Sequence, residues 1–254
     1  MDKSLKQRLK DHELTIGSWI TIGHSSVAEI MAQAGFDWLT VDMEHSAITL
    51  SEAQNLIRVI ELSGVTPLVR VGSNDSNLIK RVMDAGAHGV IVPMVNSRAD
   101  AERAVKAVKY PPEGSRGVGL ARAQKYGFGF EQYKKWCEKE SIVIVQIEHI
   151  DAVNNLEEIL TVKGIDGFFV GPYDLSGSLG KPGQFDAPAI IEALAKVKTI
   201  SDKCNALSGF HVIQPDIEDF NKKKNEGYRF IAFSLDTLFL GQMCRNLIPK
   251  LRSS

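Results

Sequence analysis

The 254-residue sequence predicts a (β/α)8 TIM barrel, and three observations support this fold. Eight short apolar runs alternate with helix-like segments, glycine often separates a helix from the next run, and no linker or change in composition divides the chain. We therefore expect a single domain over residues 1–254. A doubly wound open sheet is the alternative, but such sheets usually have fewer strands than eight.

The expected strands follow one another at similar intervals, with larger gaps where segments are inserted. They are Gly17–Thr21, Trp38–Asp42, Pro67–Val71, Gly89–Pro93, Val143–Glu148, Gly167–Gly171, Ser208–Val212 and Phe230–Ser234. The helices expected between and after them are Ser25–Ala34, Ser51–Ser63, Ser76–Ala85, Arg98–Val108, Ala152–Leu160, Pro188–Cys204, Ile217–Glu226 and Thr237–Leu251. Ser25, Ser51 and Asp236 are the residue types expected to cap helix starts.

The main irregularity is the stretch from Tyr110 to Phe130, which is rich in Gly, Pro and Arg. We expect it to form a long functional loop after the fourth strand–helix unit. Its GVGLAR segment lacks a third glycine and follows a helix rather than a strand, so a dinucleotide site is not expected here. Arg122 in this loop is a candidate contact for the distal anionic end of a substrate.

Composition excludes several classes of partner. The 30 basic and 31 acidic residues are scattered, and no basic stripe with aromatics suits nucleic acid. The three cysteines are far apart and fit neither a disulfide framework nor a zinc site. The N-terminal segment is charged, and no apolar run reaches the length of a membrane span. We expect a soluble, cytoplasmic protein.

Polar side chains follow the second and third expected strands, where a barrel holds its catalytic groups. The second strand ends in Asp42, with Glu44 and His45 just beyond it, and the third contributes Arg70. His45 is a candidate base, since histidine titrates near neutrality, although a loop histidine bonded to backbone is the alternative. Asp42 could orient His45 or a water. Glu44 either orients Arg70 or is a solvated carboxylate.

The fifth and sixth strands are expected to bring two carboxylates together. Gln146 and Glu148 face the same way on a strand, and Glu148 then meets Asp174 beyond the neighbouring strand. Two converging carboxylates favour a divalent cation such as Mg²⁺ or Mn²⁺. In the alternative, Glu148 pairs with a lysine and Asp174 caps a helix starting at Leu175. Backbone N–H groups around Tyr173 and Asp174 suit a substrate carboxylate.

These groups point to one substrate class. A metal, an arginine and outward-pointing amides together suit a small α-keto acid. A Schiff-base aldolase would need a lysine at a strand end, but Lys163 and Lys181 lie in connections and no expected strand ends in lysine. The seventh strand ends near His211, and the eighth near Ser234.

Six stretches resemble the HpcH/HpaI family of metal-dependent class II pyruvate aldolases, which includes 4-hydroxy-2-oxoheptane-1,7-dioate aldolase and 2-dehydro-3-deoxyglucarate aldolase. They are AGFDWLTVDMEHS, PLVRV, DAGAHGVIVPMV, YPPEGSRGVGLARAQKYG, VQIEHIDAVNNLEEIL and DGFFVGPYDLSGSLG, in order across about residues 15–240. The resemblance implies a barrel of the phosphoenolpyruvate/pyruvate-binding type. It also implies cleavage or formation of the C3–C4 bond of a 4-hydroxy-2-oxo acid, giving pyruvate and an aldehyde. The alternative is a related lyase acting on a CoA thioester of the citramalyl or malyl class.

The resemblance implies a role for each residue of the metal and substrate site. Glu148 and Asp174 would bind Mg²⁺, Mn²⁺ or Co²⁺, with no organic cofactor. Gln146 and the backbone at Tyr173 and Asp174 would hold the pyruvate moiety. Arg70 would stabilise the enolate and the developing alkoxide. The Tyr173 side chain departs from several relatives and could narrow the mouth, and GFHVIQPDIE after the seventh strand is also less typical.

The resemblance also implies how the base works and how the chain assembles. His45 would act as the general base through a water on the metal, with Asp42 in support. Asp84 matches a position thought to raise the basicity of that histidine. Since Asp84 falls in a helix, contact across a subunit boundary would explain its role. The family is commonly hexameric, as trimers of dimers, and the last helix, about residues 237–251, is exchanged between partners.

Overall fold

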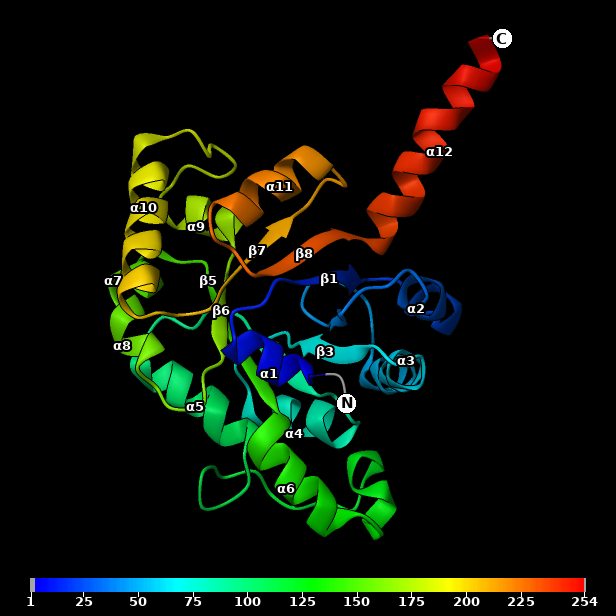
Figure 1. The fold of residues 1–254 in the computed structure, drawn as a ribbon, viewed down its shortest axis with the longest axis vertical. Helices are drawn as coiled ribbons and strands as arrows, with labels where there is room; N and C mark the ends of the chain where they lie inside the picture. Colours follow the sequence, from blue (N-terminus) through cyan, green and yellow to red (C-terminus); the bar gives the residue numbers. More distant parts are fainter. Residues whose placement is uncertain (1–2, 254) are drawn as a thin grey trace.

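Eight parallel strands close into a barrel in the order in which they occur along the chain (Figure 1). The structure, a computed structural model, describes residues 3–253, so Met1, Asp2 and Ser254 of the expected domain lie outside the described residues. The strands are β1 (Thr15–Ile20), β2 (Trp38–Asp42), β3 (Thr66–Arg70), β4 (Gly89–Val92), β5 (Ile142–Ile147), β6 (Gly167–Val170), β7 (Ser208–Val212) and β8 (Phe230–Leu235). The predicted fold class is confirmed.

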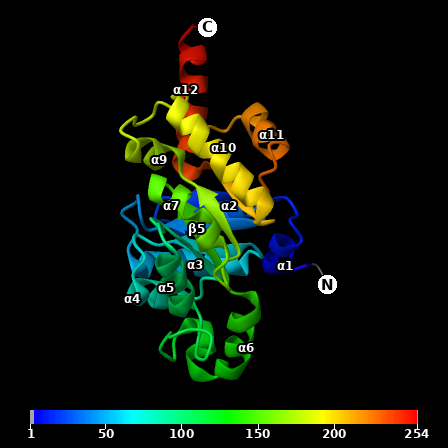
Figure 2. The same ribbon diagram turned by 90° about the vertical axis from the view of Figure 1, so that its left-hand side faces the viewer.

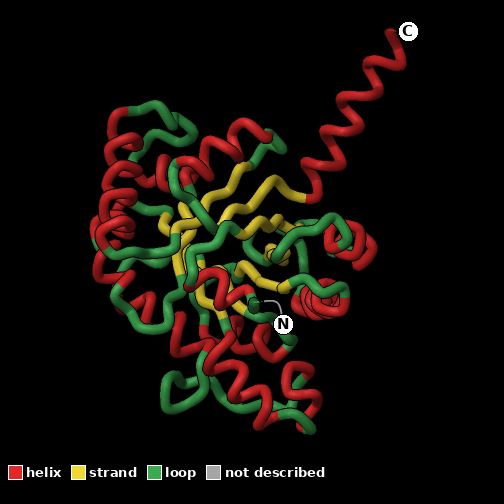
Figure 3. The backbone as a smooth tube through the Cα atoms, viewed as in Figure 1, coloured by secondary structure: helices red, strands yellow, loops and turns green. Residues whose placement is uncertain are grey.

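Helices surround the strands on the outside of the barrel (Figures 2 and 3). They are α1 (Leu5–Lys10), α2 (Ser25–Ala32), α3 (Leu50–Leu62), α4 (Ser76–Asp84), α5 (Arg98–Val108), the 3-10 helix η1 (Arg122–Gly127), α6 (Phe130–Glu140), α7 (Ile150–Asn154), α8 (Leu156–Leu160), α9 (Pro172–Ser178), α10 (Pro188–Lys203), α11 (Ile217–Asn225) and α12 (Asp236–Ser253). The expected helix Ala152–Leu160 is two short helices. Helices α1, α6 and α9 were not predicted.

Two predicted helix caps are wrong by one or two positions. His24, not Ser25, caps α2 by accepting from the Ser26 N–H at 3.2 Å. Thr49, not Ser51, caps α3 in a capping box with Glu52. In both cases, the capping side chain lies just before the serine that the sequence suggested.

The barrel interior is filled by large side chains from alternate strand positions. Trp38 of β2 stacks on Phe230 of β8 with ring centroids 4.1 Å apart, and both are fully buried. A Cβ at Gly17 of β1 would lie 2.0 Å from the Trp38 ring, so glycine leaves the room that the indole needs. The inner positions that follow this packed layer, toward the C-terminal strand ends, are polar: Arg70 follows Leu68, and Gln146 follows Ile144.

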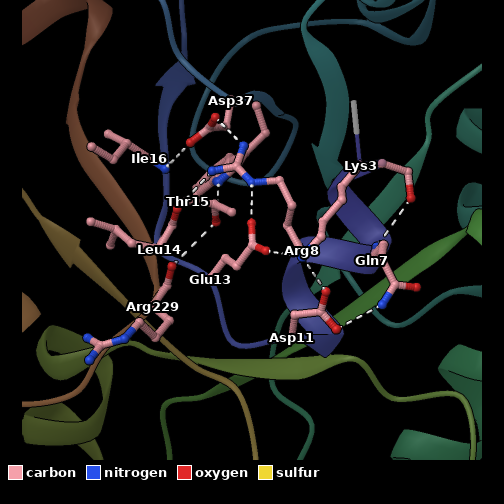
Figure 4. A network of polar contacts seen from close by, with 12 residues as sticks. Lys3, Gln7, Arg8, Asp11, Glu13, Leu14, Thr15, Ile16, Asp37 and Arg229 are labelled. Carbon is pink, nitrogen blue, oxygen red and sulfur yellow. Dashed lines mark hydrogen bonds and ion pairs between the residues drawn. The ribbon is translucent and has the colours of Figure 1, made fainter. Parts of the chain in front are cut away.

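The N-terminal helix α1 covers the other end of the barrel. Leu5 and Leu9 are buried and belong to the same core cluster as Trp38. Figure 4 shows how Arg8 ties the helix to the first strands: it donates to Asp37 Oδ1 at 2.5 Å and to the Leu14 carbonyl at 2.9 Å. Asp37 in turn accepts from the Ile16 N–H at 2.7 Å. The barrel is therefore covered at the amino ends of its strands.

The stretch after α5 lies at the same covered end and not at the mouth of the barrel. It includes η1 and leads into α6, at the foot of the molecule in Figure 1. Arg122 forms an ion pair with Glu61 and donates to the Ala85 carbonyl at 3.2 Å. Within one chain, the structure does not bring Arg122 to the distal end of a substrate at the strand ends.

The last helix, α12, extends away from the barrel (Figures 1 and 3). Its apolar side chains Leu240, Met243 and Leu247 are 62%, 61% and 48% exposed. None of the helices in residues 3–253 combines the length and the apolar character that crossing a bilayer requires.

Candidate active site

A cavity of about 310 Å³ lies at the carboxyl ends of the strands. Its walls include Trp19, His45, Arg70, Gln146, Asp174 and His211. A larger cavity, about 540 Å³, lies between α6 and the covered end of the barrel, where Arg122 and Trp136 line it. Most of the predicted site residues line the first cavity or bond to a residue that does: Asp42 bonds to Arg70, and Glu148 bonds to Gln146. We therefore place the candidate site there.

Arg70 is held in the cavity wall by three groups. It donates two parallel hydrogen bonds to Asp42, from Nε at 2.9 Å and from Nη2 at 2.6 Å. Its guanidinium lies 4.4 Å from the Trp19 ring centroid, and Nη1 lies 3.3 Å from Glu44 Oε2. This bidentate and stacked arrangement fixes the guanidinium before a substrate arrives.

Asp42 organises the turn that carries His45. Its Oδ1 accepts from the backbone N–H groups of Glu44, at 3.0 Å, and of His45, at 3.3 Å. Burial alone would raise the pKa of Asp42, but the hydrogen bonds and charge of Arg70 hold that pKa below its usual range. Asp42 thus positions His45 through the backbone and keeps its carboxylate for Arg70.

The His45 side chain is exposed at the mouth of the cavity. The side chain is 63% exposed, and Nε2 lies 3.8 Å from Glu44 Oε2. This placement leaves the imidazole accessible to a molecule in the cavity.

Glu44 points inward and pairs with Arg70, which decides between the two alternatives for this residue. Its side chain is only 15% exposed, so it is not a solvated loop carboxylate. Burial raises the pKa of Glu44 to about 7; Arg70 opposes this shift, and the charges of Asp42 and Asp174 add to it. Glu44 therefore belongs to the same group of charges as the other site residues.

Glu148 lies one residue beyond β5 and is 3% exposed. Its Oε1 accepts from the Met94 N–H at 2.7 Å, and its Oε2 accepts from Gln146 Nε2 at 2.9 Å. Burial raises the pKa of Glu148 to about 7, and the neighbouring charges of Glu44 and Asp174 contribute. Within residues 3–253, no lysine forms an ion pair with Glu148, so that alternative is not observed.

Asp174 is brought beside Glu148 by the sharp passage from β6 into α9. A Cβ at Gly171 would lie 2.9 Å from Glu148 Cβ and Oε2, so only glycine allows the chain to pass this close. The helix begins at Pro172, so Asp174 lies in its first turn and does not cap a helix starting at Leu175.

The Tyr173 side chain lines the same cavity and is half exposed. Its ring packs edge-on against Phe185, with centroids 4.8 Å apart and planes at 87°. Tyr173 thus lies in the wall of the cavity, and its effect on the width of the mouth stays a prediction.

The donor set suits a hard divalent cation. Glu148 and Asp174 supply carboxylate oxygens, and the buried Gln146 Oε1 has no hydrogen-bond partner. The raised pKa of Glu148 shows that burial and the nearby carboxylates outweigh Arg70, a balance that a bound cation would reverse. In the described part of the chain, no group of three or more His, Cys, Asp or Glu side chains forms a metal site. Water and substrate would therefore complete the coordination.

Asp84 does not reach His45 within one chain. It lies at the end of α4 and accepts from Arg116 Nη2 at 2.5 Å and from Gln124 Nε2 at 3.2 Å. Arg116 is buried, with the Tyr110 and Tyr133 rings 4.7 and 5.3 Å from its guanidinium carbon. A contact between Asp84 and His45 would need a second subunit, and it stays a prediction.

Two aromatic side chains of the cavity, Trp19 and His211, were not predicted to be part of the site. Both sit at inward positions near strand ends: Trp19 two residues beyond Gly17, and His211 two residues beyond Gly209. The available signal was the alternation of inward and outward positions along these strands. Glycines such as Gly17 and Gly209 mark inner positions where large neighbouring side chains fill the barrel, so the residues two positions further along also face inward.

Comparison with known proteins places this site in a family. The model of the HpcH/HpaI aldolase/citrate lyase family matches residues 15–241. A hydroxypyruvate/pyruvate aldolase from Roseobacter denitrificans is 36% identical over 249 residues, which covers 97% of this chain and 96% of that protein. A 2-keto-3-deoxy-L-rhamnonate aldolase from Escherichia coli is 37% identical, covering 92% of this chain and 87% of that protein.

Solved structures agree with these sequence relatives. The crystal structure of an HpcH/HpaI aldolase/citrate lyase family protein from Burkholderia cenocepacia has a TM-score of 0.92 and 34% identity, covering 99% of this chain and 100% of that one. The predicted resemblance is therefore confirmed. The chain belongs to the HpcH/HpaI aldolase/citrate lyase family.

Proposed function

We propose that this protein is a divalent-metal-dependent aldolase that cleaves or forms the C3–C4 bond of a 4-hydroxy-2-oxo acid. The products of cleavage would be pyruvate, or a substituted pyruvate, and an aldehyde. One observation carries the proposal: a fixed arginine, Arg70, shares a cavity at the strand ends with Asp174 and the exposed His45, and Glu148 is bonded to Gln146 in the wall of that cavity.

Glu148 and Asp174 would hold the cation, and Gln146 Oε1 is the nearby buried acceptor with no partner of its own. A bound Mg²⁺, Mn²⁺ or Co²⁺ would supply Lewis-acid polarisation of the keto group of the substrate. No organic cofactor is needed for this chemistry.

Arg70 would stabilise negative charge on the substrate oxygen as the carbon–carbon bond breaks. Its guanidinium cannot turn away, because Asp42 and the Trp19 ring hold it. Preorganised donors of this kind need no reorientation during the reaction, which is the source of their catalytic effect. The N–H groups in the first turn of α9, at Tyr173 and Asp174, would bind the substrate carboxylate.

His45 would remove the proton from the C4 hydroxyl in the cleavage direction and return it in the direction of synthesis. The exposed imidazole at the mouth suits this role, since the aldehyde enters and leaves at the same place. Names of relatives support the substrate class: two proteins 36% and 37% identical to this chain are named for hydroxypyruvate/pyruvate and 2-keto-3-deoxy-L-rhamnonate aldolase activity.

The test is release of pyruvate from a 4-hydroxy-2-oxo acid before and after chelation. We expect a chelator to abolish activity and Mg²⁺, Mn²⁺ or Co²⁺ to restore it. Glu148→Gln should lose binding of Mn²⁺ measured by calorimetry, whereas Glu157→Gln, an exposed substitution on α8, should retain it. Activity that survives chelation, or covalent trapping of pyruvate by borohydride, would contradict the proposal. Activity only with CoA thioesters would favour the related lyase instead.

We also propose that the chain forms homo-oligomers through α12. Exposed Leu240, Met243 and Leu247 on a helix that leaves the barrel would be covered by a second copy. Leu240→Glu with Leu247→Glu should yield smaller species in analytical ultracentrifugation. A double variant with the mass of the parent assembly would argue against this contact.

A further inference from the structure

His211 is a titratable side chain of the cavity that the proposed reaction leaves without a role. It lies on the inward face of β7, and its ring centroid is 5.6 Å from that of Trp19. The guanidinium of Arg70 lies over the same indole, 4.4 Å from its centroid. The imidazole is half-buried, and it borders the space in which the substrate would lie.

The backbone of β8 sets the tautomer of His211. The Nε2 atom lies 3.2 Å from the Ser234 carbonyl oxygen, which can only accept a hydrogen bond. Nε2 must therefore carry the hydrogen, and Nδ1 keeps a lone pair. Ser234 has a left-handed φ of 53° beside a register shift between β1 and β8, and its carbonyl also accepts from Ser18 Oγ at 3.1 Å. This irregular backbone turns the carbonyl toward the histidine.

The imidazole stays neutral over the ordinary working range. Burial lowers the pKa of His211 to about 4; the hydrogen bond to Ser234 opposes this shift, and the charge of Arg70 adds to it. At neutral pH, His211 is thus a hydrogen-bond acceptor at Nδ1 and not a second cation beside Arg70.

The other described groups of the cavity have different hydrogen-bonding capacities. Arg70 and the backbone N–H groups at the start of α9 can donate hydrogen bonds but cannot accept them. The carboxylates of Glu148 and Asp174 are assigned to the cation. Gln146 Oε1 and Glu44 Oε2 also lack a hydrogen-bond partner, but the first is placed with the cation and the second lies beside Arg70. His45 is the proposed base. Nδ1 of His211 is thus an acceptor that no proposed role uses, and it is available for a hydroxyl of the substrate.

We propose that His211 Nδ1 accepts a hydrogen bond from a substrate hydroxyl, so that the enzyme selects hydroxylated substrates. The hydroxyl would belong either to the oxo acid, as on C3 of hydroxypyruvate, or to the carbon next to the aldehyde group. This inference rests on the proposed aldolase function and adds to it a residue that determines specificity.

The experiment compares matched substrates that differ by one hydroxyl. One arm measures kcat/KM for hydroxypyruvate and for pyruvate with propanal, and the other arm measures glycolaldehyde and acetaldehyde with pyruvate. We expect His211→Leu to lower the ratio of kcat/KM for the hydroxylated substrate to kcat/KM for its deoxy partner about 10-fold, because a neutral hydrogen bond is lost. The effect should appear in the arm whose hydroxyl contacts His211. His211→Asn places an amide oxygen near the position of Nδ1 and should restore part of that ratio.

Ile213→Leu is the matched control, since Ile213 lines the same cavity and offers no hydrogen bond. It should change kcat/KM for the hydroxylated substrate and for its deoxy partner by the same factor. A ratio in His211→Leu within twofold of the parent in both arms would overturn the inference.

A measurement on the unaltered protein covers the case in which the variants fold poorly. The ¹⁵N resonance of His211 Nδ1 should shift when a hydroxylated substrate binds and shift less with its deoxy partner. Equal shifts with both would overturn the inference while leaving the aldolase proposal intact. If the parent enzyme makes and breaks no carbon–carbon bond with any of these substrates, the aldolase proposal itself fails.

Discussion

Asp42 and Arg70 form a bidentate ion pair at the ends of neighbouring strands, with N–O distances of 2.9 and 2.6 Å. The two residues are direct register partners across β2 and β3, so the sheet itself aligns them. The pair holds the guanidinium in one orientation in the wall of the candidate site. Because Asp42 also accepts from two backbone N–H groups of the following turn, one carboxylate sets the positions of both Arg70 and His45.

Asp42→Asn should therefore reduce both the activity and the stability of the protein. An amide keeps one acceptor but loses the charge and one of the two bonds to Arg70, so we expect kcat/KM to fall about 10²-fold from misplacement of the guanidinium. Loss of one partner from a buried pair should also cost about 3 kcal/mol of stability. Steady-state kinetics and urea unfolding measure the two effects. Unchanged kcat/KM would show that Arg70 does not need Asp42.

His45→Ala should slow carbon–carbon cleavage by about 10²–10⁴-fold, since it removes the proposed base. Binding of Mn²⁺ should be unchanged, because Glu148 and Asp174 remain. His24→Ala is the matched control: His24 is also a loop histidine, but its ring caps α2 by accepting from the Ser26 N–H. It should leave kcat near that of the parent. Equal rates in the two variants would exclude His45 as the base.

Gly171→Ala tests the close passage beside Glu148. The added Cβ would meet Glu148 Cβ and Oε2 at 2.9 Å, so the carboxylate must move, and we expect weaker Mn²⁺ binding and lower kcat/KM. Gly177→Ala in the same short helix meets nothing within 4 Å and should stabilise the protein slightly, by up to about 1 kcal/mol. Calorimetric titration with Mn²⁺ compares the two. Equal Mn²⁺ affinity in both variants would contradict the proposed metal site.

Glu61 gives a stability difference that depends on pH. A hydrogen bond from His88 lowers the pKa of Glu61 to about 2, and Arg122 contributes, against an opposing effect of burial. Because the folded-state pKa lies below the unfolded value of about 4.5, the stabilisation is complete above that value and decreases as pH falls toward 2. The side chain is 38% exposed, so solvent screening reduces the effect.

Urea unfolding of the parent and of Glu61→Gln between pH 3 and pH 7 would measure that difference. The two free energies of unfolding should differ by a constant amount above about pH 5 and converge below it. Glu131→Gln on the exposed face of α6 should show no such pH dependence. A gap that widened as pH fell would contradict the assignment.

The barrel and most of its strands could be predicted because each strand is a short apolar run and because these runs recur at similar intervals along the chain. The site residues at strand ends followed from the same pattern: Arg70 and Gln146 each lie two residues beyond a core side chain. The sequence left the role of Glu44 open, because only the fold shows that its side chain turns inward to Arg70. The place of Arg122 within one chain could not be predicted, because its loop returns to the amino ends of the strands, which no local pattern reveals. Alternation along β7 could have placed His211 in the cavity, but its tautomer depends on a backbone irregularity at Ser234, in another strand.

The helix α1 bears on the order in which substrates would bind. Its residues Leu5 and Leu9 close the barrel at the amino ends of the strands, so substrates and products would enter and leave at the carboxyl ends. In the proposed reaction, the oxo acid would lie deeper, between Arg70 and the cation ligands, and the aldehyde would lie above it, nearer His45. The oxo acid would therefore enter first and leave last. Pyruvate should then act as a competitive product inhibitor of the 4-hydroxy-2-oxo acid, whereas the aldehyde should inhibit in a mixed pattern.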